Sequence, residues 1–429
     1  MPREYQYKCR IRQNHLGTKI GLLLFSLLAP ACAQPLLSPE AAQEIQRLLE
    51  KPANAEKLDC QIRPQHPFLD FAFRFESGYT VACPAKTFGG EAGRLGSFVR
   101  ITPANGRPVF LGEAFAIPAV PAETRKYNDL RKMKAYLYLS GVFALGEGKY
   151  SVAVLVGDNR GRYARKEWSV SAERNHAERS VQVTMPPAMV TPMASRPWKG
   201  ERGDSPSVSR LTIILDAAPM NPYSLRLRAW DRALLLDSLS SLLMHTRSHS
   251  VRVVAMNMDQ QREVFRDDDF APQDWSRLAG RLRDLELGTV SYRALQERGW
   301  SDLLLDILSR EISDASPSDA VVFLGPTARI TDKIPTELVP RRTAEKPEFF
   351  YIEYYPVWLR GREYPDALAH VTHALGGQIL KIHSPGELAA ALKKMGSSWP
   401  PPIKPLEIRL EGAYHPARWS DPPEKGAFV

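Results

Sequence analysis

The residues with the clearest chemical pattern lie at the end of a strand predicted in the middle of the chain. Residues 211–215 form a short, mostly apolar run typical of a buried strand, and Asp216 follows directly. Ligands of open α/β sheets approach the carboxyl ends of the strands, so a carboxylate at this point is a candidate binding group. The next residues, 217–220, carry no side-chain oxygen. One carboxylate by itself holds a divalent cation weakly.

Two other groups of residues have types that could bind metal. Asp267, Asp268 and Asp269 lack the spaced ligands and the glycine of a calcium loop, so we interpret them as a solvated loop. Residues His370, His373 and His383 have no acidic partner at metalloprotease spacing, so we interpret them as surface or packing histidines.

Motifs of known catalytic sites do not occur in the sequence. It contains no G-x-S-x-G elbow, phosphate loop, H-E-x-x-H motif, Cys-His pairing or Gly-rich dinucleotide fingerprint. We therefore expect a non-catalytic protein. An envelope enzyme whose catalytic groups are dispersed along the chain is the alternative.

The elements around Asp216 alternate between strands and helices. Apolar runs predict strands at 211–215, 250–257, 320–324, 348–354 and 378–382, and helical patterns fall between them at 229–246, 274–285, 301–313, from 364 to 377, and 385–395. A short segment at 262–265 reads as an edge strand that forms a hairpin with 250–257. This alternation predicts an α/β fold with a doubly wound, mostly parallel sheet covered on both faces.

The order of these elements, together with the segments 215–219, 256–261 and 322–326, resembles the von Willebrand factor type A (vWA) domain. The resemblance covers residues 209–396 and extends to exported bacterial proteins that carry a related domain. It implies a Rossmann-like fold and a metal-ion-dependent adhesion site, in which an Asp, two Ser, a Thr and a further acidic residue hold a divalent cation that accepts a partner carboxylate.

Most of that site is missing here. Asp216 matches the first ligand, but Ala218 and Met220 occupy the two serine positions. Thr289 corresponds to the threonine, and Gly325 with Pro326 occupies the acidic position. Asp216 and Thr289 are the remaining weak candidates for metal ligands.

We therefore expect a degenerate site with no cofactor and no bound Mg²⁺. The same edge remains a candidate protein-binding site, formed by Asp216, Met220, Thr289 and Pro326. Two alternatives stay open, namely that Asp216 caps the following turn or bonds loop amides, and that a metal-dependent adhesion site uses relocated ligands.

The residues before this region predict a different architecture. Ser38 and Pro39 begin a predicted helix that ends at Glu50. Period-two alternation then predicts strands at 69–75, 79–83 and 150–156, with Tyr150 placed as in the tyrosine corner of Greek-key sandwiches. We expect an immunoglobulin-like antiparallel β-sandwich at 55–185, preceded by a helical segment at 34–54. A Pro-rich linker at 186–208 and a Pro-rich tail at 397–429 complete the predicted multidomain chain.

The N-terminus has the features of a secretory signal. A basic stretch, the apolar run 20–28 and Ala31-Cys32-Ala33 predict a signal peptide at 1–33, and the apolar run is about half of the roughly 20 residues that a membrane span needs. We expect an exported protein, periplasmic or extracellular, without a membrane span after cleavage. Removal of residues 1–33 lowers the formal charge from +9 to +5, and the charges are interspersed, so we expect a protein partner and no nucleic acid.

Two cysteines, Cys60 and Cys83, remain after the predicted cleavage. In an oxidising compartment they could pair. If the residues between them form adjacent short strands, both cysteines flank one middle strand, which argues for a separation too large for a bridge. The sequence leaves this pairing open.

Overall fold

The structure is a computed structural model. It describes residues 34–50, 57–120, 135–193, 198, 200, 208–221, 224, 226–285, 287, 299–313, 317–328, 334–340, 347–355 and 366–398. The predicted signal peptide and residues 399–429 of the predicted tail lie outside these ranges. Within them, no helix has both the length and the apolar character needed to cross a membrane.

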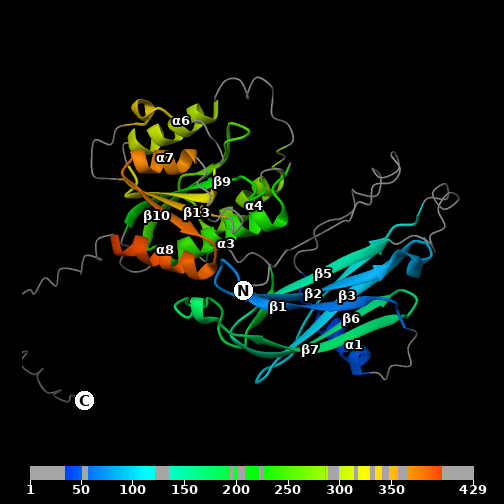
Figure 1. The fold of residues 1–429 in the computed structure, drawn as a ribbon. Coiled ribbons are helices and arrows are strands. Elements are labelled where there is room, and N and C mark those ends of the chain that lie inside the picture. The colour runs from blue at the N-terminus through cyan, green and yellow to red at the C-terminus, as the bar shows by residue number, and fades with distance from the viewer. Residues whose placement is uncertain are drawn as a thin grey trace, which may run out of the picture.

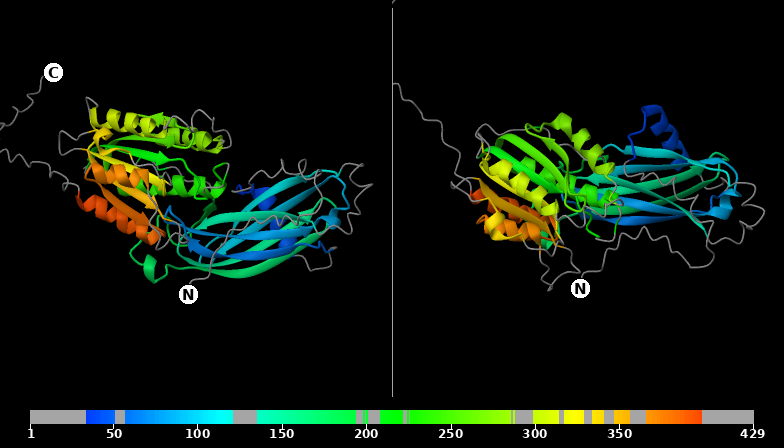
Figure 2. Two further views of the ribbon diagram at one scale, coloured as in Figure 1. Left: turned by 45° about the horizontal axis from the view of Figure 1, so that its top comes forward. Right: turned by 90° about the horizontal axis from the view of Figure 1, so that it is seen from above.

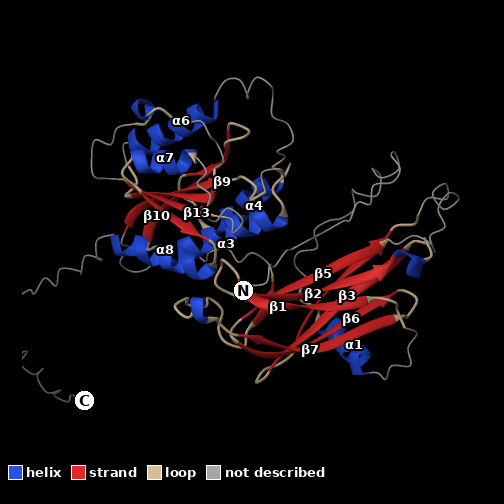
Figure 3. Ribbon diagram, in the orientation of Figure 1, coloured by secondary structure: helices blue, strands red, loops and turns tan. Residues whose placement is uncertain are grey.

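The first half of the chain forms two four-stranded antiparallel sheets (Figures 1 and 3). One has the order β1-β2-β5-β8 and the other the order β4-β3-β6-β7. The strands are β1 (Gln61–Leu69), β2 (Phe75–Pro84), β3 (Gly93–Pro103), β4 (Val109–Ile117), β5 (Tyr136–Leu145), β6 (Gly148–Asp158), β7 (Tyr163–Ala172) and β8 (Val190–Pro192).

The two sheets pack against each other through buried side chains from both. Tyr79 of β2 is fully buried, its hydroxyl lies 2.8 Å from Ser97 Oγ of β3, and its ring contacts that of Trp168 on β7. The predicted tyrosine corner is confirmed, because the Tyr150 hydroxyl donates a 2.7 Å hydrogen bond to Gly146 O. This bond fixes the chain where β5 passes into β6.

One strand prediction in this half is wrong. The alternating residues 69–75 do not form a strand; β1 ends at Leu69 and β2 begins at Phe75, with a turn between them. Asp70 Oδ1 accepts hydrogen bonds from the N–H groups of Ala72 and Arg74, and Phe73 has a positive φ of 57°. Apolar residues occur in this turn because it packs against the other half of the chain. A local sequence pattern cannot reveal such a contact.

One α-helix precedes these sheets, and two 3₁₀ turns connect their strands. Helix α1 (Pro39–Glu50) begins as predicted, with Ser38 Oγ accepting from Ala41 N. Part of the predicted linker at 186–208 is ordered instead, since β8 pairs with residues 143–145 of β5. The 3₁₀ turns η1 (Ala85–Phe88) and η2 (His176–Glu178) connect strands.

The second half forms one six-stranded sheet with the order β11-β10-β9-β12-β13-β14. All pairings are parallel except that of β11, which is antiparallel to β10 and lies at the edge. The strands are β9 (Val208–Asp216), β10 (Ser248–Asn257), β11 (Arg262–Asp267), β12 (Ala320–Pro326), β13 (Glu348–Tyr354) and β14 (Gln378–Ile382). The prediction of a mostly parallel sheet with an antiparallel edge hairpin is confirmed.

Helices cover both faces of this sheet (Figure 1). One buried cluster holds apolar residues of α3 (Ala229–His245), α4 (Trp275–Arg283) and α8 (Pro385–Ser398) together with residues of the antiparallel sheets. A second cluster, on the other face, holds residues of α6 (Gly299–Ser313) and α7 (Ala367–Ala374). The turns η3 (Pro272–Asp274) and η4 (Thr336–Leu338) lie between these elements.

The two halves meet where one end of the antiparallel sheets approaches α3 and α8 (Figures 1 and 2). The first buried cluster runs through this contact without interruption, because it includes Phe73 and Phe75 next to β1 as well as residues of α3.

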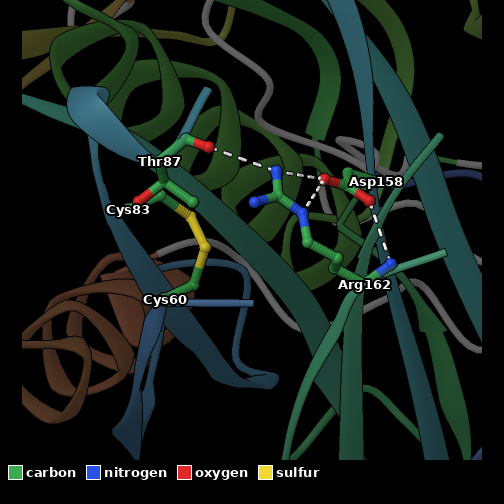
Figure 4. Close-up of a disulfide and its surroundings, with 5 residues drawn as sticks. All are labelled: Cys60, Cys83, Thr87, Asp158 and Arg162. Carbon is green, nitrogen blue, oxygen red and sulfur yellow. Dashed lines mark hydrogen bonds and ion pairs between the residues drawn. A yellow bond between two sulfur atoms is a disulfide. The ribbon is translucent and has the colours of Figure 1, made fainter. Parts of the chain in front are cut away.

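Cys60 and Cys83 form a disulfide across the first hairpin (Figure 4). Gln61 pairs with Ala82 in the β1–β2 register, so the two cysteines lie opposite each other with their Cα atoms 4.2 Å apart. No strand intervenes between them, since β1 and β2 are direct neighbours. Nearby, Arg162 donates to Asp158 and to Thr87 O; although burial raises the pKa of Asp158, the hydrogen bonds from Arg162 lower it below its ordinary value.

Candidate functional site

Asp216 is the last residue of β9, which lies at the centre of the six-stranded sheet. The parallel neighbours β10 and β12 end at the same edge, so Asp216 occupies the position at which open α/β sheets bind ligands. Its side chain is only 1% exposed, and neither carboxyl oxygen has a hydrogen-bond partner in the described part of the chain. A buried polar group without a partner is unusual and calls for a specific explanation.

The neighbouring strand ends explain why Asp216 is enclosed. A Cβ atom added to Gly325 on β12 would lie 2.6 Å from Asp216 Cβ, so only glycine lets β12 approach this closely. On the other side, Ala217 N donates to Met256 O and Asn257 Nδ2 donates to Ala217 O. These contacts hold the end of β9 between its two neighbours.

Burial and two nearby carboxylates disfavour ionisation of Asp216. Loss of water contact raises its pKa well above the ordinary value of an aspartate, and the negative charges of Asp259 and Asp366 raise it further. A carboxyl group in this setting favours its protonated form, or requires a positive charge beside it.

Asp231, which the sequence interpretation missed, holds the loop that follows β9. Its two carboxyl oxygens accept from Met220 N at 3.0 Å and from Arg228 N at 2.9 Å. The alternative role considered for Asp216, capping this loop, therefore belongs to Asp231. An acidic residue in the first turn of a predicted helix was the available signal.

A second polar network lies at the ends of β12 and β13. Thr327 Oγ1 donates to Glu353 Oε1, and Asp366 Oδ2 accepts from Ala328 N. The hydroxyl of Tyr351 lies 3.0 Å from Pro326 O and 3.2 Å from Asp366 Oδ2. Burial raises the pKa of Asp366 to about 6.

This network is mainly structural. Asp366 also accepts from Ala369 N and so caps α7, as the predicted helix start near 364–366 implied. Glu353 is buried, and its second carboxyl oxygen has no hydrogen-bond partner among the described residues. Sequence reasoning did not single out Glu353 or Tyr351, because both sit within an apolar, aromatic strand pattern.

The four predicted partner-binding residues are not equally accessible. Asp216 and Pro326 are buried, so neither presents its side chain at the surface, while Met220 is partly exposed and packs against the core. Thr289 lies outside the described residues. The exposed side chains at this edge include Arg226, Arg228, Trp230 and Asp259.

The residues around Asp216 do not fit the cation site that the vWA resemblance implies. An octahedral Mg²⁺ needs several oxygen ligands, whereas Ala218, Met220 and Gly325 supply no side-chain oxygen. In the described ranges, no three His, Cys, Asp or Glu side chains lie close enough together to hold a metal ion.

Among the aspartates at 267–269 and the histidines considered as metal ligands, several have other partners in the structure. Asp267 pairs with Arg277, and Asp268 pairs with Arg252 at 2.7 Å. His370 Nε2 lies 3.0 Å from Ile334 O, and His383 Nδ1 contacts Tyr355 O. Each of these histidines therefore packs against a backbone carbonyl.

An open cavity of about 430 Å³ lies near the edge strand β11, away from Asp216, and is lined by Arg252, Arg266, Asp268, Arg310 and Ser313. Its arginines already contact carboxylates, since Glu311 is fully buried and lies 2.8 Å from Arg252 and 3.4 Å from Arg266. Arg310 pairs with Asp306 and Glu263, so among the described residues each arginine of this cavity already has a carboxylate partner.

Comparison with known proteins adds no functional assignment. No protein-family model and no curated protein matches the sequence. Among solved structures, the ApaA protein from Bordetella pertussis is 10% identical and covers 28% of this chain and 98% of its own, with a TM-score of 0.19. A glycosyl hydrolase family 2 member from Bacteroides cellulosilyticus is 11% identical and covers 79% of this chain, which spans 41% of that protein, with a TM-score of 0.19. Scores this low carry no argument about fold or function.

Proposed function

We propose that this chain is an exported, non-catalytic protein that binds a protein partner, or acts as a scaffold, through a vWA-like C-terminal half. In this proposal the N-terminal half is an immunoglobulin-like sandwich that positions the C-terminal half. The strand order, with an antiparallel edge strand and the carboxyl ends of five parallel strands at one edge, is consistent with this architecture.

The observation that carries the proposal is the enclosed, oxygen-poor environment of Asp216. The adhesion mechanism of vWA-like domains needs an accessible cation with an open ligand position, whereas here the single matching carboxylate is buried beneath Gly325. Partner binding at this edge would then use the surface residues around it and require no metal.

Trp230 is the best candidate for a contact on that surface. It lies in the first turn of α3, directly after the loop that Asp231 holds, and 44% of it is exposed. Aromatic side chains of this kind are enriched among the energetically important residues of protein interfaces. Arg226 and Arg228 flank it as exposed cations.

A metal-dependent adhesion site with relocated ligands is the second candidate. It is motivated by the unpartnered carboxyl of Asp216, although among the described residues Asp216, Asp259 and Asp366 do not form a group that could hold an ion. In that arrangement a cation would supply the positive charge that the buried carboxyl lacks.

Crosslinking and co-purification of the chain from residue 34 onward, in Mg²⁺ and in EDTA, test both candidates. A partner retained equally in both buffers and lost from Trp230→Ala supports metal-independent binding at this edge. The matched control is Tyr138→Ala, which removes an aromatic side chain that is 58% exposed on β5 of the other half. A partner lost only in EDTA would favour the metal-dependent candidate, and loss from the control alone would move the interface to the antiparallel sheets.

A further inference from the structure

The turn between β1 and β2, residues 70–74, is rigid and points into the other half of the molecule. Asp70 accepts from two backbone N–H groups within the turn. Thr184 adds two bonds, from its N–H to Phe73 O at 2.8 Å and from its hydroxyl to Ala72 O at 2.9 Å. A turn fixed in this way presents its side chains in one geometry.

These side chains and their backbone contact α3 and β13. Ser241 Oγ on α3 donates a 2.7 Å hydrogen bond to Phe71 O. The ring of Phe71 meets Tyr354 edge-on at 5.7 Å, and that of Phe73 meets His245 edge-on at 5.2 Å. The contact joins segments separated by more than a hundred residues, so it holds the two halves together.

A buried charge cluster lies at the centre of this contact. The guanidinium of Arg74 lies 2.6 Å from Asp70 Oδ2 and 3.2 Å from Asp237 Oδ1 of α3. All three side chains are less than a tenth exposed. Glu76 on β2 is partly buried and acts electrostatically on both Arg74 and Asp237. In the described part of the chain, three carboxyl groups therefore share one guanidinium.

No other cation among the described residues that face Asp237 balances this excess. The charges that act on Asp237 come from Asp70, Arg74 and Glu76 of the hairpin, and from its own side of the interface the titratable neighbour is the phenol of Tyr354. His245, at the end of α3, has its Nδ1 atom 2.8 Å from Ser241 O and its ring against Phe73.

We propose that docking of the β1–β2 turn on α3 is linked to proton uptake, so that the interface closes most tightly in acid and loosens as the pH rises. With all three carboxyls ionised, the buried cluster would hold two uncompensated negative charges, which is unfavourable at low dielectric. A proton shared within the cluster removes part of that excess. This inference does not depend on the proposed function.

The direction and the pH range follow from the carboxyl groups themselves. Burial, followed by the charge of Asp70, raises the pKa of Asp237 to about 8, and burial with the charge of Asp70 raises that of Glu76 to about 7. When the halves separate, these groups return toward ordinary carboxyl values. The docked form therefore binds more protons, and the docking equilibrium falls as the pH rises from about 4 to about 8, by up to about tenfold per pH unit for each linked proton.

Hydrogen exchange of the chain from residue 34 onward, followed by mass spectrometry between about pH 5 and pH 9, tests this linkage. Protection factors of the amides at 71–75 and 237–245 should fall as the pH rises to about 8 and then level off, while those of β9 and β10 remain constant. The Asp237→Asn variant keeps the size of the side chain and removes its charge. It should reduce the pH dependence of the turn's protection, leaving the part that Glu76 contributes.

The control is Asp306→Asn on α6, which alters an exposed carboxylate paired with Arg310 and should retain the wild-type profile. Interface protection that does not change with pH in the wild type, or a pH slope that Asp237→Asn leaves unchanged, would overturn the proposal. If Asp237→Asn loses protection in β9 and β10 as well, the variant has not folded, and Glu76→Gln decides instead. That variant should reduce the pH slope, and an unchanged slope would refute the linkage.

Discussion

Replacement of Asp216 by alanine should stabilise this protein. The carboxyl group is buried at 1% exposure without a hydrogen-bond partner in the described chain, and its surroundings favour the protonated form. A buried polar group whose hydrogen bonds are unmet costs about 1–3 kcal/mol, and more if it is charged. Alanine removes that cost but also loses packing worth about 1 kcal/mol. We expect a net gain of up to about 2 kcal/mol at neutral pH, the difference between these two effects.

The gain should increase with pH. Because the pKa of Asp216 is raised in the folded state, the wild type binds more protons folded than unfolded above the ordinary aspartate pKa of about 4, and it loses stability as the pH rises toward the folded-state value. Asp216→Ala lacks this loss. Urea unfolding followed by tryptophan fluorescence in EDTA, at several values between about pH 5 and pH 8, measures the difference.

Asp231→Ala is the matched control, because it removes a nearby carboxylate, in the first turn of α3, that accepts from two backbone N–H groups. It should destabilise the protein by about 1–2 kcal/mol, as expected for the loss of a helix cap. An Asp216→Ala protein that is less stable than the wild type at every pH would refute the reasoning, since it would mean that the carboxyl has a stabilising partner. Stabilisation of the wild type by added Mg²⁺, lost in this variant, would identify that partner as a cation.

Two further predictions concern backbone packing and the covalent link. Replacing both Cys60 and Cys83 by alanine removes a crosslink that spans 23 residues, so it should lower the free energy of unfolding of the antiparallel half by about 3 kcal/mol, an effect that reduction of the wild type should reproduce in urea unfolding. Gly325→Ala should destabilise the parallel sheet by about 1–3 kcal/mol, because the new Cβ would meet Asp216. Its control, Gly280→Ala in α4, has no atom closer than 3.8 Å and should cost nothing, so equal thermal shifts in the two variants would contradict the close approach of β12 to β9.

Local patterns predicted the order of elements in the second half with few errors at their ends. The apolar runs of β9, β10 and β12 are continuous because both faces of a parallel sheet are buried, and the helices between them have their own periodicity. The same rule was wrong at residues 69–75. There Phe71 packs against Tyr354 of β13 and Phe73 against His245 of α3, both in the other half of the chain, and the Asx turn of Asp70 ends the strand.

The position of the candidate site could be predicted from the sequence, but the burial and protonation of Asp216 could not. Asp216 was identified because its place after a buried strand is a local property of the sequence. Its burial depends on Gly325, and the cap of its loop depends on Asp231, neither of which the local pattern of β9 contains.

The sequence by itself therefore determined the alternation of strands and helices, the hairpin at the edge of the sheet, and the absence of serine ligands beside Asp216, since each depends on residue types near one another in the chain. Only the tertiary structure decided that Asp216 is enclosed, that Cys60 meets Cys83, and that Arg74 is shared with Asp237 of α3. These depend on contacts between distant segments, where the approach of two backbones sets burial, and burial sets the charge state of the carboxyl groups.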